Sequence, residues 1–382
     1  MTPRTATVLM STTSLFSPLQ LGRYRLEHRV VMPALTRSRA AHPGSVPTAL
    51  NAQYYGQRAS QGGLVIGEAA QVTPTGRGIA RSPGIHSREQ IEGWKLVTEA
   101  VHAKHGRVFL QLWHAGRVSH SSLLPGGALP VAPSAIPIRG ETVYVAGQQV
   151  PFETPRALVT CEIASIVDAF RQAAGHALEA GFDGVEIHGA NGYLLEQFLH
   201  TRTNRREDAY GGSIANRARL TLEVTEAVAA VWGADRVGVR LSPYGVASDS
   251  GEPEPLPLYA YLVQALRKID LAYLHLIEPR ASGAGAAEVD RANVPSAAML
   301  FRPMWNKVLI SAGNYKAESA AAMVADGHAD AIAFGRLFIA NPDLPNRLRE
   351  GAALNAYDRG TFYTRGERGY TDYPAMSASR AY

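Results

Sequence analysis

The sequence is poor in the residues that build disulfides, metal clusters and membrane spans. It has 382 residues and one cysteine, Cys161, so it can form no internal disulfide, cysteine-rich zinc site or iron–sulfur cluster. No apolar run approaches the roughly 20 residues of a membrane span, and the segment 2–14 lacks the apolar core of a signal peptide. We therefore expect a reducing, cytoplasmic location and no contact with a membrane.

The chain also has little excess of charge of either sign. The chain has 38 Lys and Arg against 33 Asp and Glu, a net charge of +5, and no block of five like charges. Nucleic-acid binding needs basic residues gathered on one face, so no nucleic-acid partner is expected. The 46% of hydrophobic residues suffice for a large core.

Several ligand-binding motifs are also missing. The chain has no Gly-x-Gly-x-x-Gly after a strand, Walker-type phosphate loop, Gly-x-Ser-x-Gly elbow or His-Glu-x-x-His helix. A nicotinamide nucleotide, if one is used, is therefore not held by a Rossmann domain. His114 and His188 are possible metal ligands by residue type, but no carboxylate or third histidine stands at ligand spacing. We predict no metal site.

Short apolar runs alternate with helical patterns along the chain, which is typical of a parallel sheet built from βα units. Each run is rich in Val, Ile or Leu, as strands covered on both faces should be. Eight strands favour a single-domain α/β fold, the (β/α)₈ TIM barrel, over an open doubly wound sheet. We place the barrel at 14–382, after a flexible tail at 1–13, with strands at 30–33, 64–68, 108–112, 184–188, 237–241, 273–277, 308–311 and 331–334.

Residues at helix boundaries predict several helix ends. Ser87 followed by Gln90 indicates a capping box, and Gly106 would end that helix. Asn341 before Pro342 indicates another helix start. Two further helices are predicted at 162–180, ending at Gly181, and at 215–232, ending at Gly233.

Two neighbouring turns suggest a phosphate site. In a (β/α)₈ barrel the active site lies at the C-terminal ends of the strands. The strand at 308–311 leads into Gly313 and Asn314, and the strand at 331–334 into Gly335 and Arg336. Backbone N–H groups and a guanidinium suit a phosphate. Alternatively, the glycines only make tight turns and Arg336 is a solvated charge, but two adjacent turns with an arginine favour phosphate.

Gln111 and Arg240 interrupt apolar strands, and buried polar groups need partners. One possibility is structural, with Arg240 bonded to a carboxylate such as Glu186. The other is a ligand whose amide and carbonyl edge satisfies both side chains. An isoalloxazine ring has such an edge, and a guanidinium there would stabilise its reduced anion.

The segment 184–193 contains the third polar group. His188 and Asn191, three residues apart at a strand end, can direct two donors at one carbonyl or nitro oxygen, and Tyr193 can then deliver a proton. Against this, a single histidine at a strand end is more often structural, and the nearby glycines can mark only a turn.

Together these segments closely resemble the Old Yellow Enzyme family, from Leu15 to Pro374. The most specific stretch is His-Gly-Ala-Asn-Gly-Tyr-Leu-Leu-Glu-Gln-Phe at 188–198. It is supported by Asn-Arg-Arg-Glu-Asp-Ala-Tyr-Gly-Gly-Ser at 204–213, Leu-Thr-Arg at 35–37, Gln-Leu-Trp-His at 111–114, Arg-Leu-Ser-Pro at 240–243 and Phe-Gly-Arg at 334–336.

The resemblance implies a barrel that binds flavin mononucleotide (FMN), with roles for individual residues. His188 and Asn191 match the donors to the substrate oxygen, and Tyr193 matches the proton donor. Thr36 matches the residue that bonds flavin O4, Gln111 the residue at the pyrimidine edge, and Arg240 the residue beside N1 and O2. The other matching positions are Ala34, Leu35 and Ala69 around the ring, Gly313, Asn314, Gly335 and Arg336 at the phosphate, and Trp113 and Tyr363 on the wall of the active site.

Some positions depart from the family pattern. The order Pro33-Ala34 replaces the usual Ala-Pro before Leu35, and the pocket position that often carries tyrosine is Ile79. Loop positions that are often bulky are Ala247 and Gly285. These changes suggest a roomier, more apolar substrate pocket and leave the cofactor unaffected.

The resemblance implies an ene-reductase that takes hydride from NADPH or NADH and reduces the C=C bond of α,β-unsaturated carbonyl or nitro compounds. Hydride would come from flavin N5 and the proton from Tyr193. The alternatives are a flavin-dependent isomerase or cyclisation partner in alkaloid-type metabolism, a flavin-bearing sensor and a flavin-free barrel hydrolase. We expect a small-molecule substrate and a monomer or homodimer.

Overall fold

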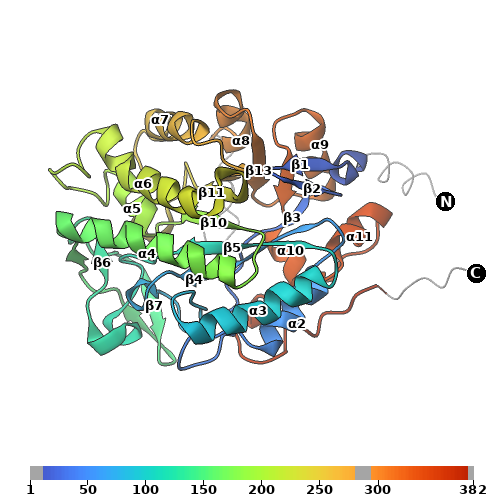
Figure 1. Cartoon of the computed structure of the whole chain (residues 1–382), viewed down its shortest axis with the longest axis horizontal. Helices are drawn as coiled ribbons and strands as arrows, with labels where there is room; N and C mark the ends of the chain where they lie inside the picture. Colours follow the sequence, from blue (N-terminus) through green and yellow to red (C-terminus); the bar gives the residue numbers. More distant parts are fainter. Residues whose placement is uncertain (1–11, 280–293, 377–382) are drawn as a thin grey trace, which may run out of the picture.

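The computed structural model describes residues 12–279 and 294–376, and eight parallel strands close into a barrel at its centre (Figure 1). Around the barrel the strands run in chain order, and the last pairs with the first. They are β3 (Val30–Met32), β4 (Leu64–Gln71), β5 (Arg107–Trp113), β10 (Gly184–Gly189), β11 (Val237–Leu241), β12 (Tyr273–Ile277), β13 (Val308–Ala312) and β14 (Ala331–Ala333). All eight predicted strands and the predicted barrel are confirmed.

Helices cover the outside of the barrel, and Figure 1 shows α3, α4 and α6 crossing over the strands. The helices are α2 (Ala49–Arg58), α3 (Arg88–His102), α4 (Thr160–Glu179), α5 (Leu194–Leu199), α6 (Ile214–Trp232), α7 (Pro255–Arg267), α8 (Ala297–Phe301), α9 (Ala317–Ala325), α10 (Gly335–Ala340) and α11 (Leu344–Glu350). The long connection from β5 to α4 holds the short strands β6 (Val131–Ala132), β7 (Thr142–Val145), β8 (Gln148–Pro151) and β9 (Arg156–Ala157).

Most of the predicted helix ends are confirmed. Ser87 and Gln90 form the capping box of α3. Gly181, two residues beyond the end of α4, and Gly233, at the C-cap of α6, have φ values of 83° and 79°, in the left-handed region that favours glycine. Helix α4 begins at Thr160, two residues before its predicted start.

Two predicted ends are wrong. The residue that turns the chain after α3 is His105, with φ 54°, and not Gly106, which leads directly into β5. Helix α11 begins at Leu344 with Asp343 as its N-cap, and not at Asn341. The Asn341 Oδ1 instead accepts the backbone N–H of Asn355 (2.7 Å), so this side chain is used to hold the following segment.

The N-terminal segment closes one end of the barrel. Strands β1 (Leu19–Leu21) and β2 (Tyr24–Leu26) form an antiparallel hairpin. Leu21 and Leu26 pack with residues at the N-terminal ends of the barrel strands, including Val31 and Leu64, in one buried apolar cluster. Residues 1–11 of the predicted tail lie outside the described ranges, while Thr12 is buried and Thr13 begins a 3₁₀ helix, η1 (Thr13–Phe16).

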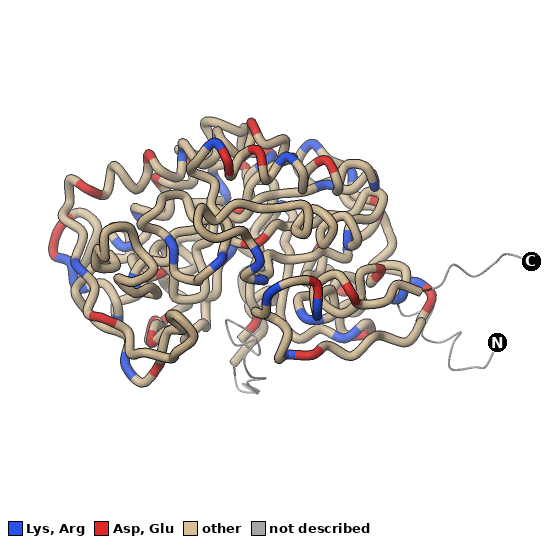
Figure 2. The backbone as a smooth tube through the Cα atoms, turned by 90° about the horizontal axis from the view of Figure 1, so that it is seen from below, with Lys and Arg blue, Asp and Glu red and all other residues tan. Residues whose placement is uncertain are grey.

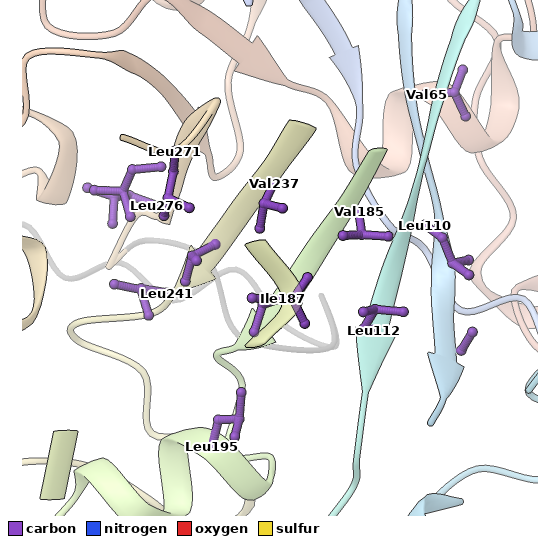
Figure 3. Close-up of a cluster of buried hydrophobic side chains, with 14 of the residues drawn as sticks. Val65, Leu110, Leu112, Val185, Ile187, Leu195, Val237, Leu241, Leu271 and Leu276 are labelled. Atoms are coloured by element: carbon purple, nitrogen blue, oxygen red, sulfur yellow. The ribbon is translucent and has the colours of Figure 1, made fainter. Parts of the chain in front are cut away.

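Alternation along each strand separates an apolar outer face from a partly polar inner one. Figure 3 shows Leu110 and Leu112 of β5, Val185 and Ile187 of β10, and Val237 and Leu241 of β11 within the main hydrophobic cluster. The residues that alternate with them on the same strands therefore point into the barrel, and these include Gln111, Glu186, His188 and Arg240.

One inner position has room only for glycine. A Cβ at Gly238 of β11 would lie 2.2 Å from Cζ of the buried Tyr273 ring on β12. Gly238→Ala is therefore expected to lower the free energy of unfolding by about 1–3 kcal/mol, because an overpacked core must shift. Gly175→Ala is the control, since this glycine lies inside α4 with no atom within 4 Å of an added Cβ.

The control should raise stability by about 0.5–1 kcal/mol, because alanine favours a helix over glycine. Urea unfolding of both variants measures the difference. Equal stability of the two would contradict this account of the β11–β12 contact.

Charged residues of both signs are mixed along the chain, as Figure 2 shows. Within the described ranges, no helix is long and apolar enough to cross a membrane.

Candidate active site

A buried carboxylate organises the polar part of the barrel interior. Glu186 of β10 accepts hydrogen bonds from Gln111 Nε2 (2.7 Å), His275 Nδ1 (2.8 Å) and Tyr273 Oη (3.2 Å), and its side chain is fully buried. Burial alone would raise the pKa of Glu186, but the His275 contact, Arg240 and Gln111 bring it below its usual value. Glu186 is therefore an anion beneath the C-terminal end of the barrel.

Arg240 lies beside this anion but does not bond to it. Its register partners are His188 on β10 and His275 on β12. The Arg240 Nε is buried and has no hydrogen-bond partner among the described residues, and Glu186 is occupied by the three donors above. Burial lowers the pKa of Arg240, and Glu186 opposes that shift. The structural alternative, an Arg240–Glu186 pair, is therefore not what the structure shows, and a buried donor remains for a ligand.

Gln111 makes a hydrogen bond within the protein that the sequence did not predict. Its Nε2 already has a protein partner, Glu186, so only its carbonyl oxygen and remaining N–H are left for a ligand. Because the carboxylate accepts and cannot donate, this bond fixes which end of the amide points toward Glu186. The strand register brings the two side chains together, since Gln111 and Glu186 are paired on adjacent strands and both point into the barrel.

Aromatic rings gather around His188 at the end of β10. The Tyr193 ring meets the His188 ring edge to face at a centroid distance of 4.9 Å and the Trp113 ring at 5.1 Å. Ile79 and Ala69 belong to the same small apolar cluster as Trp113 and Tyr193. The structure therefore brings five of the predicted site residues together from three strands and their following loops.

The protonation states in this cluster suit hydrogen-bond donors. Burial, helped by the positive charge of Arg240, lowers the pKa of His188 to about 3, so the imidazole is neutral and carries one N–H at neutral pH. Its Nδ1 is buried without a partner in the described chain. Burial raises the pKa of Tyr193, the nearby Tyr363 phenol adds to that shift, and Arg240 opposes it. Tyr193 therefore keeps its proton.

His114, the other histidine considered as a metal ligand, has a local structural contact. Its Nδ1 accepts the backbone N–H of Gly116 (3.0 Å), which holds the turn after β5. Burial lowers the pKa of His114 to about 4. Within the described ranges, no group of three His, Cys, Asp or Glu residues is placed to hold a metal ion.

The two turns predicted to bind phosphate lie side by side. Strands β13 and β14 are paired, and Arg336 Nη2 donates to Asn314 Oδ1 across the gap between their turns. Arg336 also stacks over the Tyr357 ring, 5.5 Å from its centroid. Leu35, after β3, lies 3.4 Å from the place that a Cβ of Gly335 would occupy. Predicted ring and phosphate residues therefore meet at this edge.

The segment after β3 is tied to the C-terminal part of the chain. Thr36 is half-buried, and Arg37 and Arg39 donate to the backbone carbonyls of Phe362 and of other residues between 361 and 369. Tyr363, predicted to line the site, follows Phe362 directly. These arginines explain how a residue more than 300 positions away reaches the site.

The remaining predicted pocket residues fall on two loops. Ala247 begins the 3₁₀ helix η6 (Ala247–Asp249), and its carbonyl oxygen would lie 2.5 Å from a Cβ on Gly192, so this loop abuts the turn that carries Asn191. Ala34 packs at the edge of the inner apolar cluster. Gly285 lies outside the described residues.

Comparison with known proteins agrees with this geometry. Residues 14–355 match the NADH:flavin oxidoreductase / NADH oxidase family. Rice (Oryza sativa subsp. japonica) 12-oxophytodienoate reductase 1 is 46% identical over 364 residues, which cover 95% of this chain and 93% of the relative. The chain belongs to the Old Yellow Enzyme family.

Solved structures of other Old Yellow Enzymes have the same fold. Morphinone reductase in complex with tetrahydroNAD is 50% identical, with a TM-score of 0.89, over 96% of this chain and 99% of that one. The Old Yellow Enzyme homologue of Zymomonas mobilis is 41% identical, also with a TM-score of 0.89, over 95% and 99%.

The predicted cofactor, FMN, and the predicted hydride donor, NAD(P)H, are those of Old Yellow Enzymes. The residues present fit the flavin. Arg240 offers a buried N–H that lacks a protein acceptor, and Gln111 has an amide edge left over. The two turns after β13 and β14 stand where this fold most often binds phosphate.

Proposed function

We propose that this Old Yellow Enzyme is an FMN-dependent ene-reductase that uses NAD(P)H to reduce the C=C bond of α,β-unsaturated carbonyl or nitro compounds. The observation that carries the proposal is the buried, unpartnered Nε of Arg240 directly beside His188 in the barrel register. A cation held there without a protein acceptor suits a ligand that becomes anionic on reduction. No observation of the site favours the isomerase alternative.

Ten residues would hold the cofactor. Thr36, Gln111 and Arg240 would bond the polar edge of the ring, and the others are Ala34, Leu35 and Ala69 around the ring and Gly313, Asn314, Gly335 and Arg336 at the phosphate. When bound, FMN accepts a hydride from NAD(P)H and gives it to the β-carbon of the alkene. Glu186 would keep the Gln111 amide in one orientation and lower the cost of burying the Arg240 cation.

The other residues act on the substrate. His188 and Asn191 would donate to its carbonyl or nitro oxygen, where negative charge develops as the β-carbon is reduced. His188 can do so as a neutral imidazole, because its pKa lies far below neutral pH. Tyr193 would give its phenolic proton to the α-carbon, which completes the two-electron, two-proton balance of alkene reduction. Trp113, Ile79, Ala247, Gly285 and Tyr363 would shape the pocket.

Finer properties are part of the same proposal. Cys161 as the sole cysteine is consistent with a reducing, cytoplasmic compartment. We also propose a barrel domain spanning 14–382, either NADPH or NADH as donor, and a monomer or homodimer.

Arg240→Ala tests the cofactor site. The variant is expected to bind FMN on the order of 10- to 100-fold more weakly, because a hydrogen bond to a charged group contributes about 1.5–3 kcal/mol. Flavin fluorescence during titration of the apoprotein measures the dissociation constant. Arg23→Ala is the control, since Arg23 is an exposed arginine paired with Asp235 at the opposite end of the barrel. If R240A binds FMN as tightly as the wild type does, Arg240 does not hold the flavin.

Three measurements separate the rivals. An isomerase turns its substrate over without net loss of limiting NADPH, whereas a reductase consumes one NADPH for each alkene. A flavin-bearing sensor would contain reduced flavin that cyclohexenone does not reoxidise in stopped-flow experiments. A flavin-free hydrolase would be colourless when purified.

A further inference from the structure

The turn that carries Asn191 has an unfavourable backbone conformation. Asn191 has φ 60° and Gly192 has φ 78°, so two successive residues lie in the left-handed region. A left-handed residue other than glycine costs roughly 1 kcal/mol, although asparagine tolerates it better than most. Some other part of the protein must therefore hold this turn in place.

A buried carboxylate provides that support from below. The Gly192 N–H donates to Glu196 Oε2 at 2.5 Å. The Asn191 N–H donates to Ser242 Oγ at 2.9 Å, so the Ser242 hydroxyl is free to donate onward, and it does so to Glu196 Oε1 at 2.5 Å. Both peptide N–H groups of the turn therefore end, directly or through one hydroxyl, at the same carboxylate.

A second chain of hydrogen bonds reaches Glu196 from the opposite side. The Gly251 N–H donates to His200 Nδ1 (3.1 Å), so the proton of the neutral imidazole lies on Nε2, which contacts Tyr259 Oη at 2.8 Å. The Tyr259 hydroxyl then donates to Glu196 Oε1 at 3.1 Å. Burial lowers the pKa of His200 to about 3, in agreement with one ring proton.

All the groups that bond to Glu196 are thus donors. A carboxylate can accept from all of them, whereas a carboxylic acid would place its own O–H among donors. Glu196, Tyr259 and His200 are completely buried and Ser242 nearly so, so water cannot replace a lost bond cheaply.

We propose that Glu196 is a positioning residue, whose carboxylate holds the 191–192 turn so that the Asn191 side chain can donate to the substrate oxygen. This inference rests on the proposed function, because it assigns Asn191 to substrate binding. Glu196 itself contacts neither substrate nor cofactor. Its effect should therefore appear in the affinity for substrate and leave the binding of FMN unchanged.

The protonation of Glu196 makes the proposal measurable. Burial raises its pKa to about 7, against the opposing effect of its three donors. The titratable groups that face it are Tyr259 and His200, the latter at 3.9 Å, and the Arg217–Glu252 pair lies beyond them. Tyr259 and His200 stay neutral between pH 5.5 and 8.5, so among these groups only Glu196 changes its charge in this range. Burial also raises the pKa of Glu68, on β4, to about 7, and any pH dependence that remains in Glu196→Gln would belong to that residue. The turn should be held above pH 7 and loosened below it.

The experiment measures binding of 2-cyclohexenone to the oxidised FMN-loaded enzyme, by the change in flavin absorbance, from pH 5.5 to 8.5. This ketone has no titratable group and is not reduced without NADPH. In the wild type the dissociation constant is expected to rise as the pH falls through about 7. In Glu196→Gln it should be about 10-fold higher at pH 8, the equivalent of one lost charged hydrogen bond, and independent of pH.

Two further readouts and two further variants keep the proposal falsifiable. The FMN dissociation constant and the flavin midpoint potential should not change in E196Q, whereas a general structural defect would move them. Asp183→Asn is the matched control, because Asp183 is a buried carboxylate that accepts the Val108 N–H (2.8 Å) at the opposite end of the barrel, and its loss should leave the affinity for cyclohexenone unchanged. If E196Q does not fold, Ser242→Ala, which removes the link to the Asn191 N–H, should weaken binding in the same direction.

Three results would contradict the positioning role proposed for Glu196. They are wild-type affinity of E196Q at every pH, an equal loss in D183N, and a parallel loss of FMN binding in E196Q. A wild-type enzyme that neither binds cyclohexenone nor is reoxidised by it would instead contradict the proposed function.

Discussion

Tyr193→Phe is expected to slow the reoxidation of the reduced enzyme by cyclohexenone by about 10²- to 10⁴-fold, the usual contribution of a placed acid. Reduction of the enzyme by NADPH should be nearly unchanged, because that half-reaction needs no proton from Tyr193. Stopped-flow absorbance at the flavin band measures each half-reaction separately.

The structure gives the reason for so large an effect. Tyr193 is wedged between the Trp113 and His188 rings, and burial raises its pKa, so the phenol is a fixed and fully protonated donor. Phenylalanine keeps the ring contacts and removes only the hydroxyl. Trp113→Phe serves as a control for packing, and it should affect both half-reactions to a similar, smaller extent. Equal losses in both half-reactions of Tyr193→Phe would remove Tyr193 from the role of proton donor.

His188→Ala is expected to slow reoxidation by about 10²- to 10³-fold, as the loss of one donor to a developing oxyanion does in other enzymes. The neutral imidazole provides one N–H to the substrate oxygen, and alanine provides none. The same variant should lose most of the long-wavelength charge-transfer band that a phenol produces when its phenolate binds over oxidised flavin.

The rate is checked by stopped flow and the band by titration with p-hydroxybenzaldehyde. His328→Ala, which alters a half-buried histidine after α9, provides the comparison, with both readouts expected at the wild-type level. An intact phenol band in H188A would show that the oxygen of the ligand does not bind at His188.

The barrel could be predicted because each strand carries its own signal. Runs such as that of β10 are apolar at alternate positions, and the polar residues between them point inward whatever the rest of the chain does. This places His188, Gln111 and Arg240 in one space from sequence alone. The spacing of helix-cap residues was less informative where a side chain had a distant partner, as Asn341 does with Asn355.

The hydrogen-bond networks could not be predicted in this way. Glu186 joins residues 75 and 89 positions away, and Glu196 joins residues 46 and 63 positions away. Such partners are set by strand register and by loops that meet in space, for which a single sequence holds no local signal. Glu186 was foreseen only as a partner of Arg240, and the structure assigns its hydrogen bonds to Gln111, His275 and Tyr273 instead.

The pocket illustrates the same limit. Ile79 joins the cluster of Trp113 and Tyr193, and Ala247 abuts the Asn191 turn. Their roles in the substrate pocket stay predictions. Both are smaller or less polar than the residues that often stand there.

The hairpin of β1 and β2 determines from which end of the barrel a ligand can enter the active site. Its leucines fill the floor of the barrel in the part of the chain that the structure describes, so a ligand can approach Arg240 and Gln111 only from the His188 end. The nicotinamide nucleotide and the alkene therefore enter from the same end of the barrel. If both stack on the same flavin face, as the proposed function requires, a high concentration of either should obstruct the other.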